Sequence, residues 1–201
     1  MYIKGESMDF KNTETIKNLT RAFASECQDG AKYQYMADEA EQSKMSEVST
    51  ILKGLATNEM AHAKIFYDYI AERCETTKNL VVDIKASYPM EKEPLEKMLS
   101  VKAENEQFQA ETVYPAFAKT AKKEGYEDIA NKLMVIADIE QNHNKTLKTL
   151  YDKIKNNSLY QENQKTLWTC NNCGYQESSK KAWKKCPLCA KDQGFVKLNI
   201  Q

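Results

Sequence analysis

Apolar side chains recur at steps of three and four residues through four long stretches of this chain, and this is the period of an α-helix. Glycine and proline, which interrupt helices, number only 6 and 4 among 201 residues. Each stretch holds roughly 30 residues, so each predicts a rod roughly 45 Å long. The four predicted helices cover residues 13–43, 46–73, 94–124 and 127–155.

The connections between these helices favour one bundle topology. Short breaks near residue 44 and at Gly125 join the first helix to the second and the third to the fourth. Residues 76–94 instead lose the helical period, look extended at Leu80–Val82 and contain two prolines. Two short loops and one long crossover predict a mainly α protein with a ferritin-like four-helix bundle, in which Pro115 should kink or loosen the third helix.

Acidic residues and both histidines interrupt the apolar stripes. Each histidine follows a glutamate by three residues, which places the two side chains on one helix face. Unpaired carboxylates inside a bundle would each cost roughly several kcal/mol, and divalent cations would cancel that charge. The pattern predicts a dinuclear iron or manganese site with the ligands Glu26, Glu59, His62, Glu106, Glu140 and His143.

Two tyrosines on the stripes are candidates to support this site. Tyr33 lies two helical turns after Glu26 on the same face, so its hydroxyl is expected to reach a ligating carboxylate. Tyr114 fits either a place in the core or the same supporting role.

Four of the six cysteines lie in the last 32 residues, as two Cys-x2-Cys pairs separated by twelve residues. Four thiolates form a tetrahedral site for a single iron or for zinc, and the spacing leaves an Fe(Cys)4 centre and a structural zinc ribbon open. The predicted ligands are Cys170, Cys173, Cys186 and Cys189. We expect a bundle at 1–155, a polar linker at 156–166 and a small metal domain at 167–201, with Cys27 and Cys74 as ordinary helix residues.

Charge and hydropathy argue against several classes of function. The 29 Lys and Arg residues balance the 29 Asp and Glu residues, which is unlike a nucleic-acid-binding protein. No apolar run approaches the ~20 residues that cross a bilayer, and the N-terminal residues lack the apolar core of a secretory signal. The clustered cysteines indicate a reducing compartment. We therefore expect a cytoplasmic protein that binds neither nucleic acid nor a membrane.

The sequence resembles the rubrerythrin family from about residue 13 to its C-terminus. The segments that carry the resemblance are Ala24–Gln28, Glu59–Lys64, Tyr114–Ala118, Glu140–His143 and the Trp-x-Cys-x2-Cys-Gly-Tyr…Cys-Pro-x-Cys tail at 168–189. The resemblance implies a ferritin-like di-iron domain joined to a rubredoxin-like Fe(Cys)4 domain. It also implies a homodimer that reduces hydrogen peroxide with electrons from a donor such as rubredoxin or an NAD(P)H-dependent reductase.

The resemblance assigns roles to the ligands as well: Glu26 and His62 on one iron, Glu106 and His143 on the other, and Glu59 and Glu140 as bridges. Gln109 departs from the family, whose members usually carry a second carboxylate there, three residues after Glu106. We expect its side chain to point into the site, where a carboxamide is a weaker ligand for ferric iron. The alternatives are ligation through the Gln109 carbonyl oxygen or compensation by Glu104 or Glu111, which both lie off the stripe.

Two functional hypotheses follow from these features. The first is a non-haem di-iron peroxidase in oxidative-stress protection, whose Fe(Cys)4 centre re-reduces the metal pair. The second is a ferroxidase or iron-handling protein with a structural zinc ribbon, and zinc could occupy either site in a recombinant sample. Because His143 lies about 18 Å of helix before Lys155, we also expect a head-to-tail homodimer that brings each cysteine site to the partner's bundle.

Overall fold

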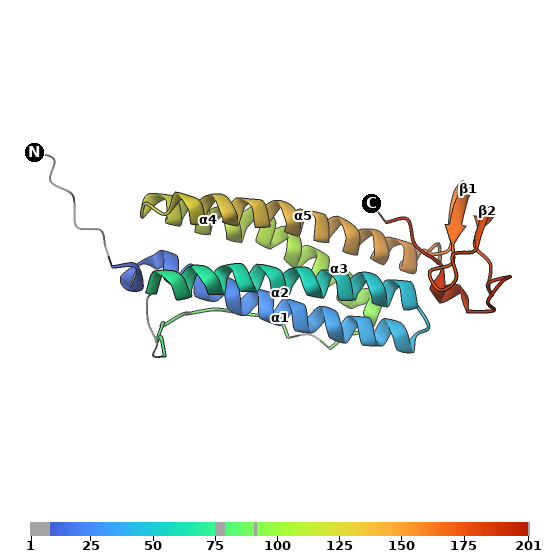
Figure 1. The fold of residues 1–201 in the computed structure, drawn as a ribbon, viewed down its shortest axis with the longest axis horizontal. Coiled ribbons are helices and arrows are strands. Elements are labelled where there is room, and N and C mark those ends of the chain that lie inside the picture. Colours follow the sequence, from blue (N-terminus) through green and yellow to red (C-terminus); the bar gives the residue numbers. More distant parts are fainter. Residues whose placement is uncertain (1–8, 75–78, 91, 201) are drawn as a thin grey trace, which may run out of the picture.

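The computed structural model describes residues 9–74, 79–90 and 92–200, and it confirms a mainly helical protein built on a four-helix bundle (Figure 1). The helices are η1 (Phe10–Asn12), α1 (Glu14–Gln42), α2 (Ser46–Cys74), α3 (Leu95–Phe108), η2 (Gln109–Val113), α4 (Tyr114–Lys123) and α5 (Glu127–Lys155). Helices α1 and α2 form one hairpin, and the α3–η2–α4 rod forms a second hairpin with α5. None of the described helices has the length and apolar content that a membrane crossing requires.

The connection between α2 and α3 runs back along the length of the bundle beside α1 (Figure 1). Leu80 and Val82 pack against the bundle core, whereas Val81 is 85% exposed, which is the alternation of an extended segment. The long crossover predicted at 76–94 is therefore found in its described part, and residues 76–78 and 91 lie outside the described residues.

The third rod is not the continuous helix that the sequence predicts. Its middle, η2, is a π-helical turn in which the Tyr114 backbone N–H donates to the Gln109 carbonyl. The next residue, Pro115, has no N–H, and its ring would clash with the carbonyl four residues earlier in an α-helix. A wider turn before the proline relieves that clash, so the irregularity expected at Pro115 lies just before it. The rod ends as predicted at Gly125, whose φ is +89°.

Two apolar clusters fill the bundle, one at each end. One cluster, near the α1–α2 loop, includes Met36, Leu52 and Leu147. The other, at the opposite end, includes Ile16 and Phe66 together with residues of α4 and the start of α5. The candidate ligands fall between the two clusters in all four rods, so apolar layers separate them from both ends of the bundle.

The C-terminal residues form a small module with a two-stranded antiparallel sheet, β1 (Gln161–Thr169) and β2 (Gln176–Lys181), and the short helix η3 (Gln193–Phe195). Residues 156–166 differ from the polar linker that we expected, because β1 already begins at residue 161. Leu159 is 6% exposed and joins the bundle's apolar cluster, which ties this connection to the end of α5. The local composition is polar, but Leu159 and the partly buried Tyr160 both pack against this cluster.

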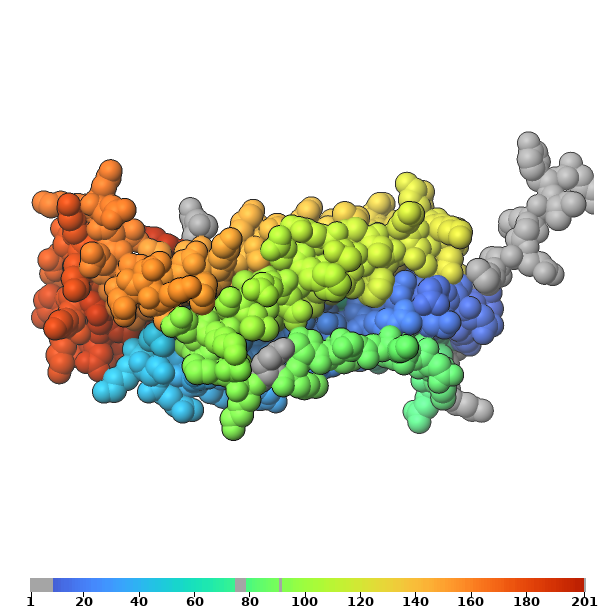
Figure 2. All heavy atoms as spheres, turned by 180° about the vertical axis from the view of Figure 1, so that it is seen from behind, coloured from blue at the N-terminus to red at the C-terminus, as the bar shows by residue number. Residues whose placement is uncertain are grey.

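The cysteine module packs on the end of the bundle formed by the α1–α2 loop and the end of α5 (Figures 1 and 2). Leu198 packs into the bundle's apolar cluster, and the Asn171 side chain donates a hydrogen bond of 2.7 Å to Glu47 Oε2. Gly194 lies so close to the loop that an added Cβ would sit 2.0 Å from the Lys44 carbonyl oxygen. The fit at this contact therefore requires glycine.

We expect Gly194→Ala to separate the module from the bundle. A backbone carbonyl cannot yield as a flexible side chain can, so the free energy of unfolding should fall by about 1–3 kcal/mol. The turn at 156–160 should also be cut faster in limited proteolysis. The control is Gly54→Ala, since a Cβ at Gly54 meets nothing within 4 Å and alanine favours the helix. Equal melting temperatures and equal cleavage rates in the two variants would show that the contact at Gly194 does not require glycine.

Candidate metal centres

Four carboxylates and two imidazoles meet in the middle of the bundle. They come from all four rods: Glu26 from α1, Glu59 and His62 from α2, Glu106 from α3, and Glu140 and His143 from α5. None of the six is more than 4% exposed. Their helical spacing explains this convergence, because each occupies a position of the apolar stripe that faces the bundle axis.

The six residues form two overlapping groups. Within each group the candidate ligand atoms lie within 4.8 Å of one another. One group is Glu26, Glu59, His62 and Glu140, and the other is Glu59, Glu106, Glu140 and His143. Glu59 and Glu140 belong to both groups, and the two imidazole rings stack with their centroids 5.9 Å apart.

The two shared carboxylates each present one oxygen to each histidine. Glu59 Oε2 lies 3.3 Å from His62 Nδ1, and Glu59 Oε1 lies 3.1 Å from His143 Nδ1. Glu140 Oε1 lies 3.0 Å from His62 Nδ1, and Glu140 Oε2 lies 2.8 Å from His143 Nδ1. A carboxylate directed to both histidines in this way has the geometry of a bridge between two cations.

The donor set fits metal ions. Among the described residues, Glu59 Oε1, both Glu140 side-chain oxygens, Glu106 Oε2 and His143 Nδ1 are buried without a hydrogen-bond partner. Buried polar atoms are normally paired, so cations bound by the two groups would supply the partners that these atoms lack. Carboxylate and imidazole ligands suit iron and manganese.

The pKa values of these groups reflect the same crowding of charge. Burial alone would lower the pKa of His62, but Glu140, Glu26 and Glu59 outweigh it and raise this pKa to about 12. Burial also lowers the pKa of His143, but Glu140 and Glu59 outweigh it and raise this pKa to about 9. Burial raises the pKa of Glu106 to about 8. Without metal, the histidines thus hold protons that metal binding would displace.

Tyrosine hydroxyls support the two unshared carboxylates. Tyr33 donates a hydrogen bond of 2.5 Å to Glu106 Oε1, and Tyr114 donates to Glu26 Oε1. Both rings are at most 1% exposed. Each hydroxyl fixes the orientation of one carboxylate, and burial, followed by the negative charge of Glu106, raises the pKa of Tyr33 well above its usual value.

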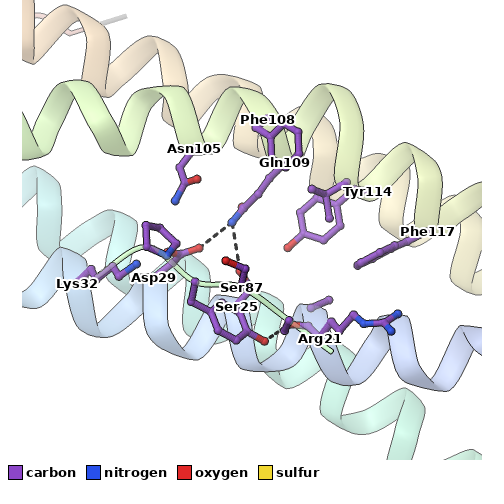
Figure 3. A pocket seen from close by; sticks show the side chains of 15 residues that line it. Arg21, Ser25, Asp29, Lys32, Ser87, Asn105, Phe108, Gln109, Tyr114 and Phe117 are labelled. Carbon is purple, nitrogen blue, oxygen red and sulfur yellow. Dashed lines mark hydrogen bonds between the residues drawn. The ribbon is translucent and has the colours of Figure 1, made fainter. Parts of the chain in front are cut away.

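Gln109 is placed differently from the expectation that it points at the metal ligands. Its amide nitrogen donates to Asp29 Oδ2 at 2.8 Å and to Ser25 Oγ at 3.3 Å, both on α1 (Figure 3). It is the first residue of the π turn, which alters the direction of the side chains that follow Phe108. Glu104 and Glu111 are exposed, as expected, and take no part in the site.

Sequence reasoning missed three other residues beside the ligands. Lys102 and Asp29 are both buried, with Lys102 Nζ 2.8 Å from Asp29 Oδ1 and 2.6 Å from Glu106 Oε1. Asn58 Nδ2 lies 3.4 Å from His143 Nε2, on the ring edge opposite the carboxylates. The available signal was position, since Lys102 is one turn before Glu106 on the same stripe.

A cavity of about 200 Å³ lies next to the ligand layer, between α1, the crossover and the π turn (Figure 3). Its lining includes Ser25, Asp29, Gln109 and Tyr114. Tyr114 also donates to Glu26, so one wall of the cavity contacts a candidate ligand directly. The cavity is large enough for several small molecules of the size of water.

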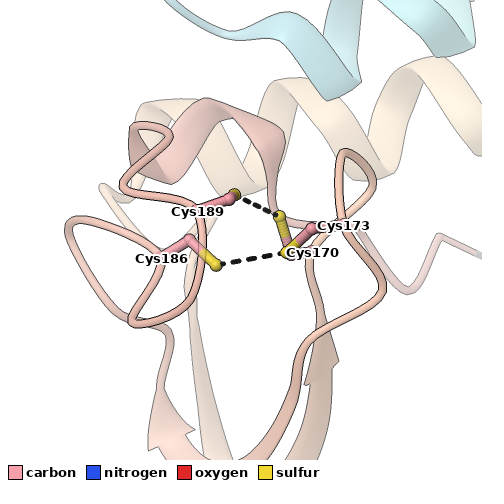
Figure 4. A group of neighbouring side chains, drawn as sticks. All are labelled: Cys170, Cys173, Cys186 and Cys189. Carbon is pink, nitrogen blue, oxygen red and sulfur yellow. Dashed lines mark hydrogen bonds between the residues drawn. The ribbon is translucent and has the colours of Figure 1, made fainter.

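The second centre consists of four cysteines in the C-terminal module (Figure 4). Their sulfur atoms lie within 4.8 Å of one another, with 3.7 Å between Cys170 and Cys189 and 3.6 Å between Cys173 and Cys186. The backbone N–H of Lys191 lowers the pKa of Cys189 to about 6, which favours the thiolate that a metal requires.

The two Cys-x2-Cys turns share one backbone geometry. Gly174 N–H donates to the Cys170 carbonyl and Ala190 N–H donates to the Cys186 carbonyl, each at 2.9 Å. Gly174 and Ala190 both have positive φ, 75° and 58°. The repeated turn aims the two pairs of sulfurs at one point, as a four-thiolate iron or zinc site needs. Cys27 and Cys74 lie elsewhere, on α1 and α2.

Comparison with known proteins adds an independent line of information. The family model described as Rubrerythrin matches residues 17–158. The chain is 33% identical to Rubrerythrin-1 of Clostridium acetobutylicum over 189 residues, which are 94% of this chain and 95% of that protein. It is 32% identical to the rubrerythrin of Porphyromonas gingivalis over 188 residues, 92% of this chain and 90% of that protein.

Solved structures with the same fold include ferritin-like proteins. A mixed-valence structure of nigerythrin matches with a TM-score of 0.60 and 21% identity, over 99% of this chain and 100% of that one. A bacterioferritin of Desulfovibrio desulfuricans with a di-iron site matches with a TM-score of 0.62 and 22% identity, over 72% of this chain and 82% of that one. These likenesses confirm the ferritin-like fold of the bundle.

Proposed function

Because this chain belongs to the rubrerythrin family, a family of di-iron oxidoreductases in oxidative-stress defence, we propose that it reduces hydrogen peroxide to water. The observation that carries the proposal is the pair of shared carboxylates, Glu59 and Glu140, each directed to both histidines. A pair of bound ferrous ions would supply one electron each to the O–O bond. Two ions bridged in this way suit a two-electron substrate.

The protein's own groups would hold and isolate this pair. We assign Glu26 and His62 to one ion and Glu106 and His143 to the other, with the two shared carboxylates as bridges. The Tyr33 and Tyr114 hydroxyls keep the unshared carboxylates in place. The apolar clusters on both sides exclude bulk water, and the neighbouring cavity offers a small polar oxidant a way in.

The four-cysteine centre would return electrons to the metal pair from an external donor such as rubredoxin or an NAD(P)H-dependent reductase. The module lies beside Ser46 at the start of α2, however, and Glu59 is 13 helical residues further along, or about 20 Å. Electron transfer slows steeply with distance, so we propose a head-to-tail homodimer in which each module serves the partner's bundle. Such a protein would act in the cytoplasm, where thiolates stay reduced.

Anaerobic stopped-flow mixing tests the peroxidase proposal. The fully reduced protein should oxidise its ferrous pair with one equivalent of hydrogen peroxide, and much faster than with dioxygen at the same concentration. The reason is that peroxide accepts two electrons and forms only water. Oxidation by dioxygen at an equal or higher rate would contradict the proposal and favour a ferroxidase.

The visible spectrum of protein isolated without added metal tests the electron route. We expect a red protein with thiolate-to-iron absorption that disappears on reduction, together with three iron ions per chain by metal analysis. The Cys173→Ser variant should lose this colour and keep two irons. A colourless protein with one zinc per chain would favour the alternative, an iron-handling protein with a structural zinc ribbon.

A further inference from the structure

A lysine ammonium lies inside the bundle, against the layer of metal ligands. Lys102 is 4% exposed, and its Nζ is 2.6 Å from Glu106 Oε1 and 2.8 Å from Asp29 Oδ1. The same ammonium lies 5.1 Å from the centre of the Tyr33 ring. A lysine is seldom buried unless it is paired, so these two carboxylates hold a positive charge next to the site.

Asp29, on α1, is the second carboxylate that pairs with the lysine. Its Oδ1 faces Lys102, and its Oδ2 accepts the hydrogen bond from Gln109 Nε2 (Figure 3). Asp29 is itself only 3% exposed. Gln109, Asp29, Lys102 and Glu106 thus form a continuous chain of polar contacts from the cavity wall to the ligand layer.

The direct contact of this chain with the ligand layer is at Glu106, which belongs to one of the two groups. Glu106 Oε1 meets both the Tyr33 hydroxyl and the Lys102 ammonium. Its counterpart in the other group, Glu26, meets the Tyr114 hydroxyl and the His62 ring instead. An ammonium on a carboxylate offsets its negative charge and repels a second cation brought to the same group.

We propose that the Asp29–Lys102 pair makes the two metal positions unequal. The position formed by Glu59, Glu106, Glu140 and His143 binds a divalent ion more weakly than the position formed by Glu26, Glu59, His62 and Glu140. Lys102 does not touch the metal ion itself and acts through its contact with Glu106, as a positioning residue. In the metal-free protein, its positive charge stabilises the folded bundle against the repulsion among the buried carboxylates. This inference rests on the ligand assignment in the proposed function.

Titration of the metal-free, full-length protein with manganese(II) measures both positions. Manganese suits carboxylate and imidazole ligands better than four thiolates, and its electron paramagnetic resonance signal reports the free ion. We expect two binding constants that differ by about tenfold or more. Lys102→Met should tighten the weaker constant by about tenfold and change the stronger one little. The control is Lys97→Met, an exposed lysine on the same helix that pairs with Glu93.

Two further variants guard against a failure to fold. Lys102→Met with Asp29→Asn removes both buried charges together and should also tighten the weaker constant. Asp29→Asn alone leaves Lys102 paired with Glu106 only, and it should weaken manganese binding at the weaker position further. The melting temperature of the metal-free protein should fall more in Lys102→Met than in Lys97→Met, and manganese should restore it.

The outcomes separate this inference from the site assignment. Two equal manganese-binding constants in the natural protein would overturn the inference while the metal site stands. The same conclusion would follow if the weaker constant were the same in Lys102→Met as in Lys97→Met. Manganese that binds the natural protein and Glu59→Ala identically would overturn the site, and with it the inference.

Discussion

Replacing Glu59 by alanine is expected to abolish peroxide reduction. Glu59 is one of the two carboxylates that face both histidines, so its loss removes an oxygen ligand from each metal position at once. Metal affinity should fall by more than the roughly 10–100-fold that follows from loss of a supporting residue. Metal analysis after dialysis and the peroxidase rate at saturating peroxide measure the effect.

The matched control for this variant is Glu72→Ala, an exposed glutamate on the same helix. It should keep its full metal content and activity. The metal-free Glu59→Ala protein should remain folded, because Glu140 still faces both histidines. Full metal content and activity in Glu59→Ala would contradict the bridging role.

Mixing two inactive variants is expected to restore activity if each cysteine module serves the partner's bundle. Cys170→Ser removes a thiolate from one centre, and Glu59→Ala disables the other. A mixed dimer then retains one complete pairing, formed by the intact bundle of one chain and the intact module of the other. Random exchange gives mixed dimers in half of the population, so the recovered activity should be about a quarter of the natural value.

Each variant assayed alone sets the baseline for this experiment, and a mixture of either variant with itself is the control for the exchange procedure. Formation of the mixed dimer is verified by native mass spectrometry. A mixture that contains mixed dimers but has no activity above the baseline would show that electrons travel within one chain or arrive from an external donor at the bundle.

The helices and the set of ligands that converge could be predicted because both depend on local periodicity. A glutamate three residues before a histidine lies on the same helix face in any helical protein, and the surrounding leucines show that this face is buried. Glu26 and Glu106 also lie on the buried faces of their helices, and the structure brings them to these pairs. No tertiary information was needed for either step.

The remaining features depend on tertiary contacts that a linear pattern does not record. From the sequence, Lys102 would be expected to pack its methylene stem and to extend its charge to solvent. In the structure it pairs instead with Asp29 on α1, which is 73 residues away in the sequence. Gly194 of the cysteine module packs against Lys44 of the bundle, and no pattern in the sequence links these two positions. Leu159 anchors a segment whose composition is otherwise that of a linker.

The π turn in the third rod acts as a one-residue insertion in the register of the site. Glu106 and Tyr114 are eight residues apart, and in an uninterrupted α-helix they would differ by about 80° around the axis. The wider turn absorbs one residue, so the two behave like positions seven apart, which differ by only about 20°. Both can then face the ligand layer, Glu106 as a candidate ligand and Tyr114 as the donor to Glu26. A chain shortened by one residue within 109–113 would place the two residues seven apart, so an uninterrupted α-helix would keep this alignment without the π turn.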